Sequence, residues 1–90
     1  MNICKRCYIS GRVQGVTFRY YTQQQAQKLG VTGWAHNLTD GRVEVLAYGE
    51  SDAVNKLCLW LHKGPSSAHV VEVKCQTETD FNIPNSFGIG

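Results

Sequence analysis

The sequence has little net charge and no long apolar run, and both absences exclude classes of protein. Nine lysines and arginines against seven aspartates and glutamates leave a formal charge of +2. That charge is too small to indicate nucleic-acid binding by electrostatics alone. No apolar stretch approaches the ~20 residues that span a membrane, and the N-terminus lacks a signal-peptide pattern. We therefore expect a soluble, cytoplasmic protein with neither membrane nor nucleic acid among its partners.

The length allows one hydrophobic core and no second one. Ninety residues correspond to a single domain over residues 1–90. Such a chain buries roughly 60–65% of its unfolded surface, enough for a modest core without metals or disulfides. A monomer is expected, because the sequence shows no exposed apolar stripe.

Four cysteines are present, but their spacing is not that of a metal site or a redox motif. Cys4 and Cys7 form C-x-x-C inside an apparent strand, where odd spacing directs them to opposite faces. Redox motifs of this kind begin a helix, and a zinc site needs two further ligands at similar spacing. We expect free cysteines in a reducing compartment and no bound metal, with a fortuitous disulfide as the alternative.

Apolar periodicity and turn residues predict the element order β-α-β-β-α-β. The expected strands cover residues 3–10, 31–38, 43–48 and about 69–77, with a short terminal strand at 87–89; the expected helices cover 18–29 and a segment capped by Ser51 or Asp52 that ends at Gly64. This order is typical of the α+β, ferredoxin-like split βαβ fold. It predicts an antiparallel sheet in the strand order 4-1-3-2, with both helices on one face.

Residues 11–19, Gly-Arg-Val-Gln-Gly-Val-Thr-Phe-Arg, lead from the first strand through a loop into the first helix. Arg19 falls in the first helical turn, where a cation is unfavourable by about 0.3–1 kcal/mol because the helix start is already positive. A bound anion would reverse that cost, and phosphate suits a site with both backbone donors and a guanidinium. The alternative is an ordinary strand-to-helix turn with a solvated arginine.

Asn37 ends the second strand on the face that the helices cover. It shares that face with Gly33 and Ala35, so a polar amide there needs an explanation. One explanation is a turn in which the asparagine hydrogen-bonds its own backbone before the Asp40-Gly41 hairpin. The other, which the topology favours, is an amide directed into the space beside the loop and Arg19.

The residues near this loop lack the usual catalytic groups. The loop is accompanied by neither a Ser/His/Asp set nor a pair of carboxylates, and no lysine follows it as in a Walker P-loop. Thr17 could in principle be a nucleophile, but no base accompanies it in the sequence. We therefore expect Thr17 to contribute only its backbone N–H to the loop. A substrate whose leaving group departs as a carboxylate needs only stabilised phosphoryl oxygens and water held in line. This reasoning indicates an acyl phosphate as substrate.

Two segments resemble the signatures of the acylphosphatase family. Residues 11–19 resemble G-R-V-Q-G-V-x-F-R, and residues 33–44 resemble G-W/Y-x-x-N-x-x-D-G-x-V-E. The resemblance implies a hydrolase without metal or cofactor that releases a carboxylate and inorganic phosphate, and we expect phosphate to inhibit competitively. Arg19 would bind the phosphate and Asn37 would orient the water. Backbone amides of the loop would cradle the phosphate, from Gln14, Gly15, Val16, Thr17 and Phe18.

The sequence departs from the family pattern near its C-terminal end. The family commonly ends in an aromatic-x-Ile strand followed by a basic residue, whereas residues 87–90 read Phe-Gly-Ile-Gly. The last strand is therefore expected to be weak. Two other functions stay open: an RNA-binding ferredoxin-like domain, although Tyr8 and Tyr48 form no RNP motif, and a non-catalytic phosphoanion-binding domain.

Overall fold

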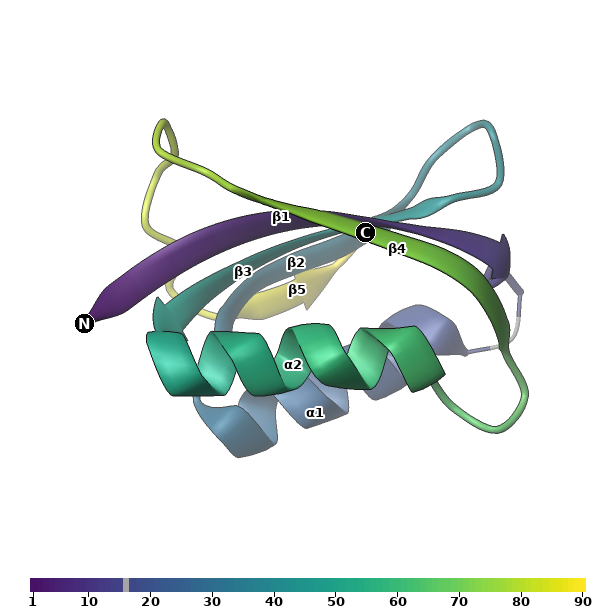
Figure 1. The fold of residues 1–90 in the computed structure, drawn as a ribbon, viewed down its shortest axis with the longest axis horizontal. Helices are drawn as coiled ribbons and strands as arrows, with labels where there is room; N and C mark the ends of the chain where they lie inside the picture. The colour runs from purple at the N-terminus through teal and green to yellow at the C-terminus, as the bar shows by residue number, and fades with distance from the viewer. Residues whose placement is uncertain (16) are drawn as a thin grey trace.

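The computed structural model describes residues 1–15 and 17–90, which form five strands and two helices (Figure 1). In chain order the elements are β1 (Asn2–Arg12), α1 (Phe18–Leu29), β2 (Thr32–Asn37), β3 (Val43–Glu50), α2 (Ser51–Lys63), β4 (His69–Thr77) and β5 (Phe87–Ile89). The bounds of α1, β4 and β5 are those predicted, and the remaining strands differ by at most two residues at either end. Of the helices in this described part, none is both long and apolar enough to cross a membrane.

One sheet carries the strands in the order β4-β1-β3-β2-β5, and both helices cover the same face of it (Figure 1). This arrangement confirms the predicted ferredoxin-like fold and the strand order 4-1-3-2. Because β1 and β2 are both antiparallel to β3, their C-terminal ends lie at the same end of the sheet. The terminal strand makes the sheet mixed, since β5 pairs in parallel with β2.

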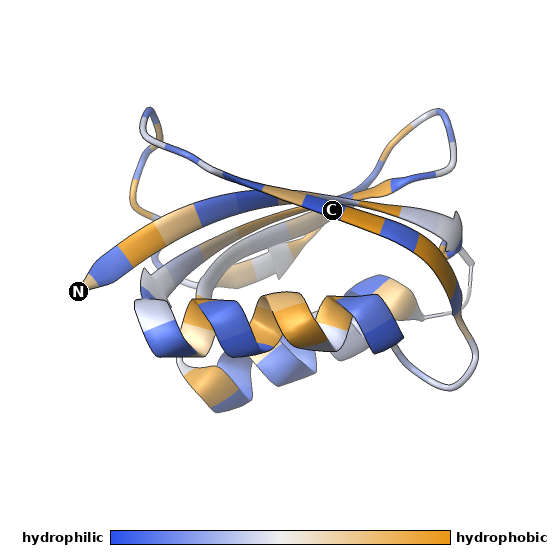
Figure 2. Cartoon of the chain, in the orientation of Figure 1, coloured by the Kyte–Doolittle hydropathy of each residue, from blue (hydrophilic) through white to orange (hydrophobic). Residues whose placement is uncertain are grey.

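The core fills the space between the sheet and the helices. Ile9 of β1, Phe18 of α1, and Leu57 and Leu61 of α2 are fully buried in one cluster. Burying a side chain of this size contributes about 1.5–3 kcal/mol. Figure 2 shows apolar and polar residues interspersed along β1 and around α2. Of β1, Cys7 and Ile9 are buried in the core and the residue between them is only partly buried, as expected for a strand with one face in a core.

The start of α2 differs from the prediction, because neither Ser51 nor Asp52 is the capping residue. Glu50, the last residue of β3, occupies the N-cap position. The chain passes directly from strand to helix there, and the backbone N–H of Ser51 donates to the carbonyl of Met1 at 2.9 Å. Asp52 instead lies in the first turn, where a negative charge favours the positive end of the helix.

Arg6 organises the sheet face opposite the helices. Its guanidinium donates to Glu44 at 2.6 Å and to Glu78 at 2.7 Å, and these bonds raise the pKa of Arg6. The same group lies 5.5 Å from the ring centre of Trp34, which stacks on His36 with ring centres 4.2 Å apart. Arginine and aromatic groups of this face are thus engaged with one another, which does not favour the RNA-binding alternative.

The cysteines correct the expectation of four free thiols. Cys7 and Cys75 face each other in the β1–β4 register and form a disulfide, with their Cα atoms 4.0 Å apart. Cys4 and Cys58 are free and buried. The expectation was wrong because it used spacing along the chain, whereas the sheet brings together two cysteines separated by 68 residues.

Breaking this disulfide should destabilise the protein. A cross-link over 68 residues restricts the unfolded chain, and bridges of this kind typically contribute about 2–4 kcal/mol. We expect Cys75→Ser to lower the free energy of unfolding by that amount in urea titrations without reductant. In the presence of a phosphine reductant the variant and the unsubstituted protein should have similar midpoints. A reductant that leaves the midpoint of the unsubstituted protein unchanged would contradict the prediction.

Candidate active site

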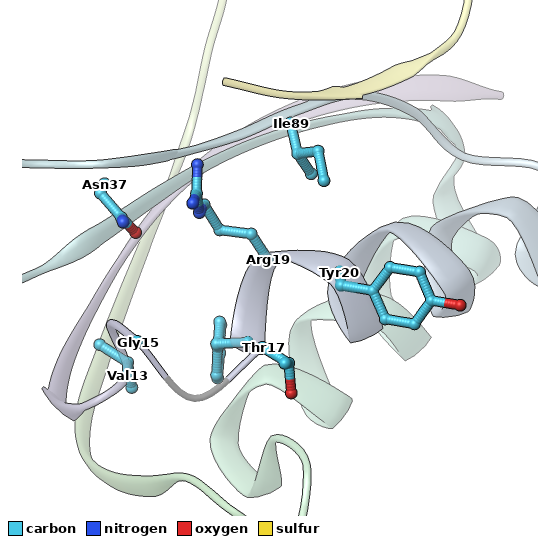
Figure 3. A pocket seen from close by; sticks show the side chains of 8 residues that line it. Val13, Gly15, Thr17, Arg19, Tyr20, Asn37 and Ile89 are labelled. Atoms are coloured by element: carbon cyan, nitrogen blue, oxygen red, sulfur yellow. The ribbon is translucent and has the colours of Figure 1, made fainter.

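A cavity of about 330 Å³ opens where β1 and β2 end and α1 begins. Figure 3 shows its walls: the loop after β1 on one side, the last residue of β2 on another, and the terminal strand β5 above. The cavity is lined by Val13, Gly15, Thr17, Phe18, Arg19, Tyr20, Asn37 and Ile89. The structure therefore brings residues from three separate segments of the sequence into one site.

Arg19 extends from the first turn of α1 into this cavity (Figure 3). The first turn contains no acidic residue to balance its charge, so the cation adds to the positive end of the helix dipole. The guanidinium donates one hydrogen bond to the backbone oxygen of Gly90. Because a guanidinium has five N–H donors in a planar fork, this contact leaves capacity for an oxyanion.

Asn37 is the last residue of β2 and pairs with Val43 of β3. Its two predecessors on the same side of the strand, Gly33 and Ala35, are buried, whereas Asn37 is exposed at the strand end. The amide and the guanidinium of Arg19 line the same cavity, on the two sides of one open space (Figure 3). Strand alternation thus directs a neutral hydrogen-bonding group to the place where Arg19 supplies positive charge.

Two of the described residues in the loop between β1 and α1 have positive φ. Gly15 has φ 72° and Thr17 has φ 61°, and both line the cavity. Phe18 also reaches the cavity and is otherwise buried in the core, where its ring lies 6.0 Å from that of Trp60. Val16, which the sequence also assigned to the phosphate cradle, lies outside the described residues.

Gln14 has a role that sequence reasoning missed. Its side-chain amide donates to the carbonyls of Leu38 and Arg42, at 2.8 and 2.9 Å, and so ties the loop to the β2–β3 hairpin beside Asn37. Asp40 orders the same hairpin by accepting from the backbone N–H of Arg42, which lowers the pKa of the Asp40 carboxyl. No motif in the sequence predicts these hydrogen bonds of Gln14, because their acceptors are backbone carbonyls.

Three lining residues were also missed: Val13, Tyr20 and Ile89. The terminal strand was expected to be weak, yet Phe87 is buried and its carbonyl accepts from the side chain of Gln23 at 2.7 Å. This anchoring holds Ile89 over the cavity. A search for charged and polar groups could not find these residues, since they contribute shape.

Comparison with known proteins decides the family. The acylphosphatase family model matches residues 5–89. A curated acylphosphatase of Halorhodospira halophila is 58% identical over 85 residues, which cover 94% of this chain and 91% of the relative. The chain belongs to the acylphosphatase family.

Solved acylphosphatases have the same fold. The structure of the Coxiella burnetii acylphosphatase superposes with a TM-score of 0.92 at 36% identity, covering 99% of this chain and 93% of that one. The Bacillus subtilis acylphosphatase gives a TM-score of 0.93 at 33% identity, covering 100% and 99%. Membership of the acylphosphatase family confirms the predicted enzyme class, a hydrolase of acyl phosphates, over the non-catalytic alternatives.

Removing the side chain of Gln14 should impair this acylphosphatase site without unfolding the protein. Gln14→Ala deletes two partly buried hydrogen bonds, each with a net contribution of about 0.5–1.5 kcal/mol. We expect the free energy of unfolding to fall by about 1–3 kcal/mol and kcat/KM for benzoyl phosphate to fall roughly 10-fold through misplacement of the loop. Gln27→Ala, at an exposed position of α1, is the matched control. Equal kcat/KM in both variants would refute the role of Gln14.

Thr17 offers a test of backbone strain at the cavity. A β-branched residue with φ 61° is strained by roughly 1–3 kcal/mol, and glycine adopts this conformation freely at an entropic cost of about 0.5–1 kcal/mol. We expect Thr17→Gly to raise the free energy of unfolding in urea titrations, and Thr17→Ala to raise it less. A decrease in Thr17→Gly would show that contacts of the threonine side chain outweigh the strain.

Proposed function

We propose that this chain hydrolyses acyl phosphates through Arg19, Asn37 and the loop amides. The observation that carries this proposal is that Arg19 of α1 and Asn37 of β2 line one cavity at the start of a helix (Figure 3). The two residues come from both of the segments that resemble the family signatures. They supply the two functions that the chemistry needs, which are charge for the phosphoryl group and a hydrogen-bonding partner for water.

The phosphoryl group of the substrate binds at the beginning of α1. Backbone N–H groups at a helix start point toward the solvent without helical partners and attract anions. We assign the cradle to the amides of residues 14–18, including Val16 on the strength of the sequence signature alone. Arg19 then replaces its contact with the Gly90 carbonyl by charge-assisted bonds to two phosphoryl oxygens, which are roughly twice as strong as neutral ones.

Asn37 holds the attacking water. Its side-chain oxygen accepts a hydrogen bond from water and its amide group donates one, so it orients the molecule without removing its proton. The water oxygen forms a bond to phosphorus as the bond from phosphorus to the acyl oxygen breaks. The carboxylate leaves with the electron pair of that bond, and the water proton passes to an oxygen of the phosphate.

This mechanism assigns no step to a metal or a cofactor. Charge on the phosphoryl oxygens is stabilised by the loop amides and Arg19, and donors of this kind placed in advance act on the transition state without reorganisation. Inorganic phosphate, as product, occupies the same cradle and inhibits competitively. We further propose a monomeric, cytoplasmic enzyme with no nucleic-acid partner; these three points remain predictions from the sequence.

Benzoyl phosphate hydrolysis, followed by ultraviolet absorbance in the presence of a chelator, tests the proposal. We expect full activity with the chelator and competitive inhibition by phosphate. Arg19→Ala and Asn37→Ala should each lower kcat/KM by at least roughly 100-fold, the effect of removing one oxyanion donor in other enzymes. The matched controls Lys28→Ala and Asn55→Ala, both at exposed helix positions, should keep their activity.

Several outcomes would contradict the assignment. Wild-type activity in a folded Asn37→Ala variant would exclude Asn37 as the group that holds water. Activity lost on chelation and restored by a divalent cation would exclude the metal-free mechanism.

Arg19→Ala should also have a free energy of unfolding, measured without phosphate, at least equal to that of the unsubstituted protein. The substitution removes a cation from a helix start that lacks acidic residues.

A further inference from the structure

Three cysteine side chains meet on the helix-covered side of the sheet, apart from the catalytic cavity. Cys7 comes from β1, Cys75 from β4 and Cys58 from α2. Their sulfur atoms all lie within 4.8 Å of one another, and the sulfurs of Cys7 and Cys58 are 3.7 Å apart. The acylphosphatase mechanism uses none of these residues, so their convergence needs its own explanation.

The cluster is buried at two of its corners and open at the third. Cys7 is fully buried and Cys58 is 8% exposed, whereas Cys75 is exposed on β4, an edge strand of the sheet. The cluster is therefore open to solvent at its Cys75 corner, on the β4 edge.

The positions of the sulfurs do not suit thiol–disulfide exchange, in which the Cys58 sulfur would attack Cys7 and displace Cys75. In thiol–disulfide exchange the attacking sulfur, the attacked sulfur and the leaving sulfur lie nearly in line. In a collinear set, the distance between the sulfurs of Cys58 and Cys75 would be the 3.7 Å contact plus an ordinary disulfide bond of about 2.05 Å, which exceeds the 4.8 Å limit of the cluster. Cys58 therefore lies to the side of the Cys7–Cys75 bond, and the three sulfurs form a triangle.

A triangle of sulfurs is the arrangement that a three-coordinate thiolate site requires. With metal–sulfur bonds of about 2.3 Å, an ion at the centre of such a triangle has sulfurs about 4 Å apart. The 3.7 Å between the sulfurs of Cys7 and Cys58 is close to this distance, whereas the bonded sulfurs of Cys7 and Cys75 reach it only after the disulfide is reduced. Thiolates select soft ions, of which Cu(I) takes three sulfur ligands readily. Among the described residues no histidine or carboxylate joins the group, whereas structural zinc takes four ligands.

We propose that Cys7, Cys58 and Cys75 form a three-thiolate site for a soft monovalent metal ion, Cu(I), when the Cys7–Cys75 disulfide is reduced. A dithiol or phosphine supplies the two electrons that convert the disulfide to two thiols. Binding of Cu(I) then forms three copper–sulfur bonds and releases three protons. The disulfide and the metal site exclude each other, because both use the same two sulfurs.

Lys5 supplies a positive charge near the cluster. Three thiolates around a monovalent ion carry two net negative charges, which are costly inside a protein unless a cation lies nearby. Lys5 is two residues from Cys7 in β1 and thus shares its side of the sheet.

Anaerobic titration of the phosphine-reduced protein with Cu(I), against a chromophoric Cu(I) chelator, tests this site. We expect one equivalent of Cu(I) per chain, with sulfur-to-copper charge-transfer absorption in the ultraviolet and three sulfur neighbours by X-ray absorption spectroscopy. The oxidised protein should leave the ion with the chelator. Cys58→Ala should weaken binding at least 10-fold while retaining the disulfide in its oxidised form, which shows that the variant folds.

Cys4→Ala is the matched control, because Cys4 is also a free, buried cysteine of the described structure but is not part of the cluster. It should bind Cu(I) as tightly as the unsubstituted protein. Equal affinity in Cys58→Ala and in the unsubstituted protein would overturn the proposal, as would loss of binding in Cys4→Ala. Retention of Cu(I) by the oxidised protein would likewise overturn it. None of these readouts depends on hydrolysis of acyl phosphates.

Discussion

The antiparallel pairing of β3 with both β1 and β2 is the constraint on which the rest of this structure depends. Val43 of β3 pairs with Ile9 on one side and with Asn37 on the other, so the last residue of β2 is level with Ile9, close to the end of β1 at Arg12. That alignment places the loop after β1 beside the amide that ends β2. A slip of one residue in the β2–β3 register would turn every side chain of β2 to the opposite face, and Asn37 would leave the cavity that Arg19 enters.

The bounds of α1, the face of Asn37 and the topology could be predicted from the sequence, because local sequence patterns specify them. The apolar period of α1 and its glycine stop gave the predicted bounds of that helix, and the helix start then set the position of Arg19. Two-residue alternation along β2 identified the face of Asn37, since Gly33 and Ala35 behave as buried residues. Element order supplied the topology, because right-handed crossovers leave few ways to assemble two such units.

The features that the sequence did not reveal depend on contacts between distant segments. The two hydrogen bonds of Gln14 join it to backbone carbonyls of a hairpin, and every residue has such a carbonyl, so no residue pattern marks the acceptors. The Cys7–Cys75 bridge follows from the register of β4 against β1, which only the assembled sheet defines. Ile89 reaches the cavity because β5 returns parallel to β2, and three residues carry too weak a pattern to predict this.

The Cys7–Cys75 bridge also restricts strand exchange at the β4 edge of the sheet. β4 spans nine residues at one edge, and a long unpaired strand border is where proteins exchange segments or add further chains. A strand that is covalently attached to its neighbour cannot peel away and be replaced by the same strand of a second molecule. Oxidation at this position therefore acts against domain swapping, and that protection is lost whenever the two sulfurs separate.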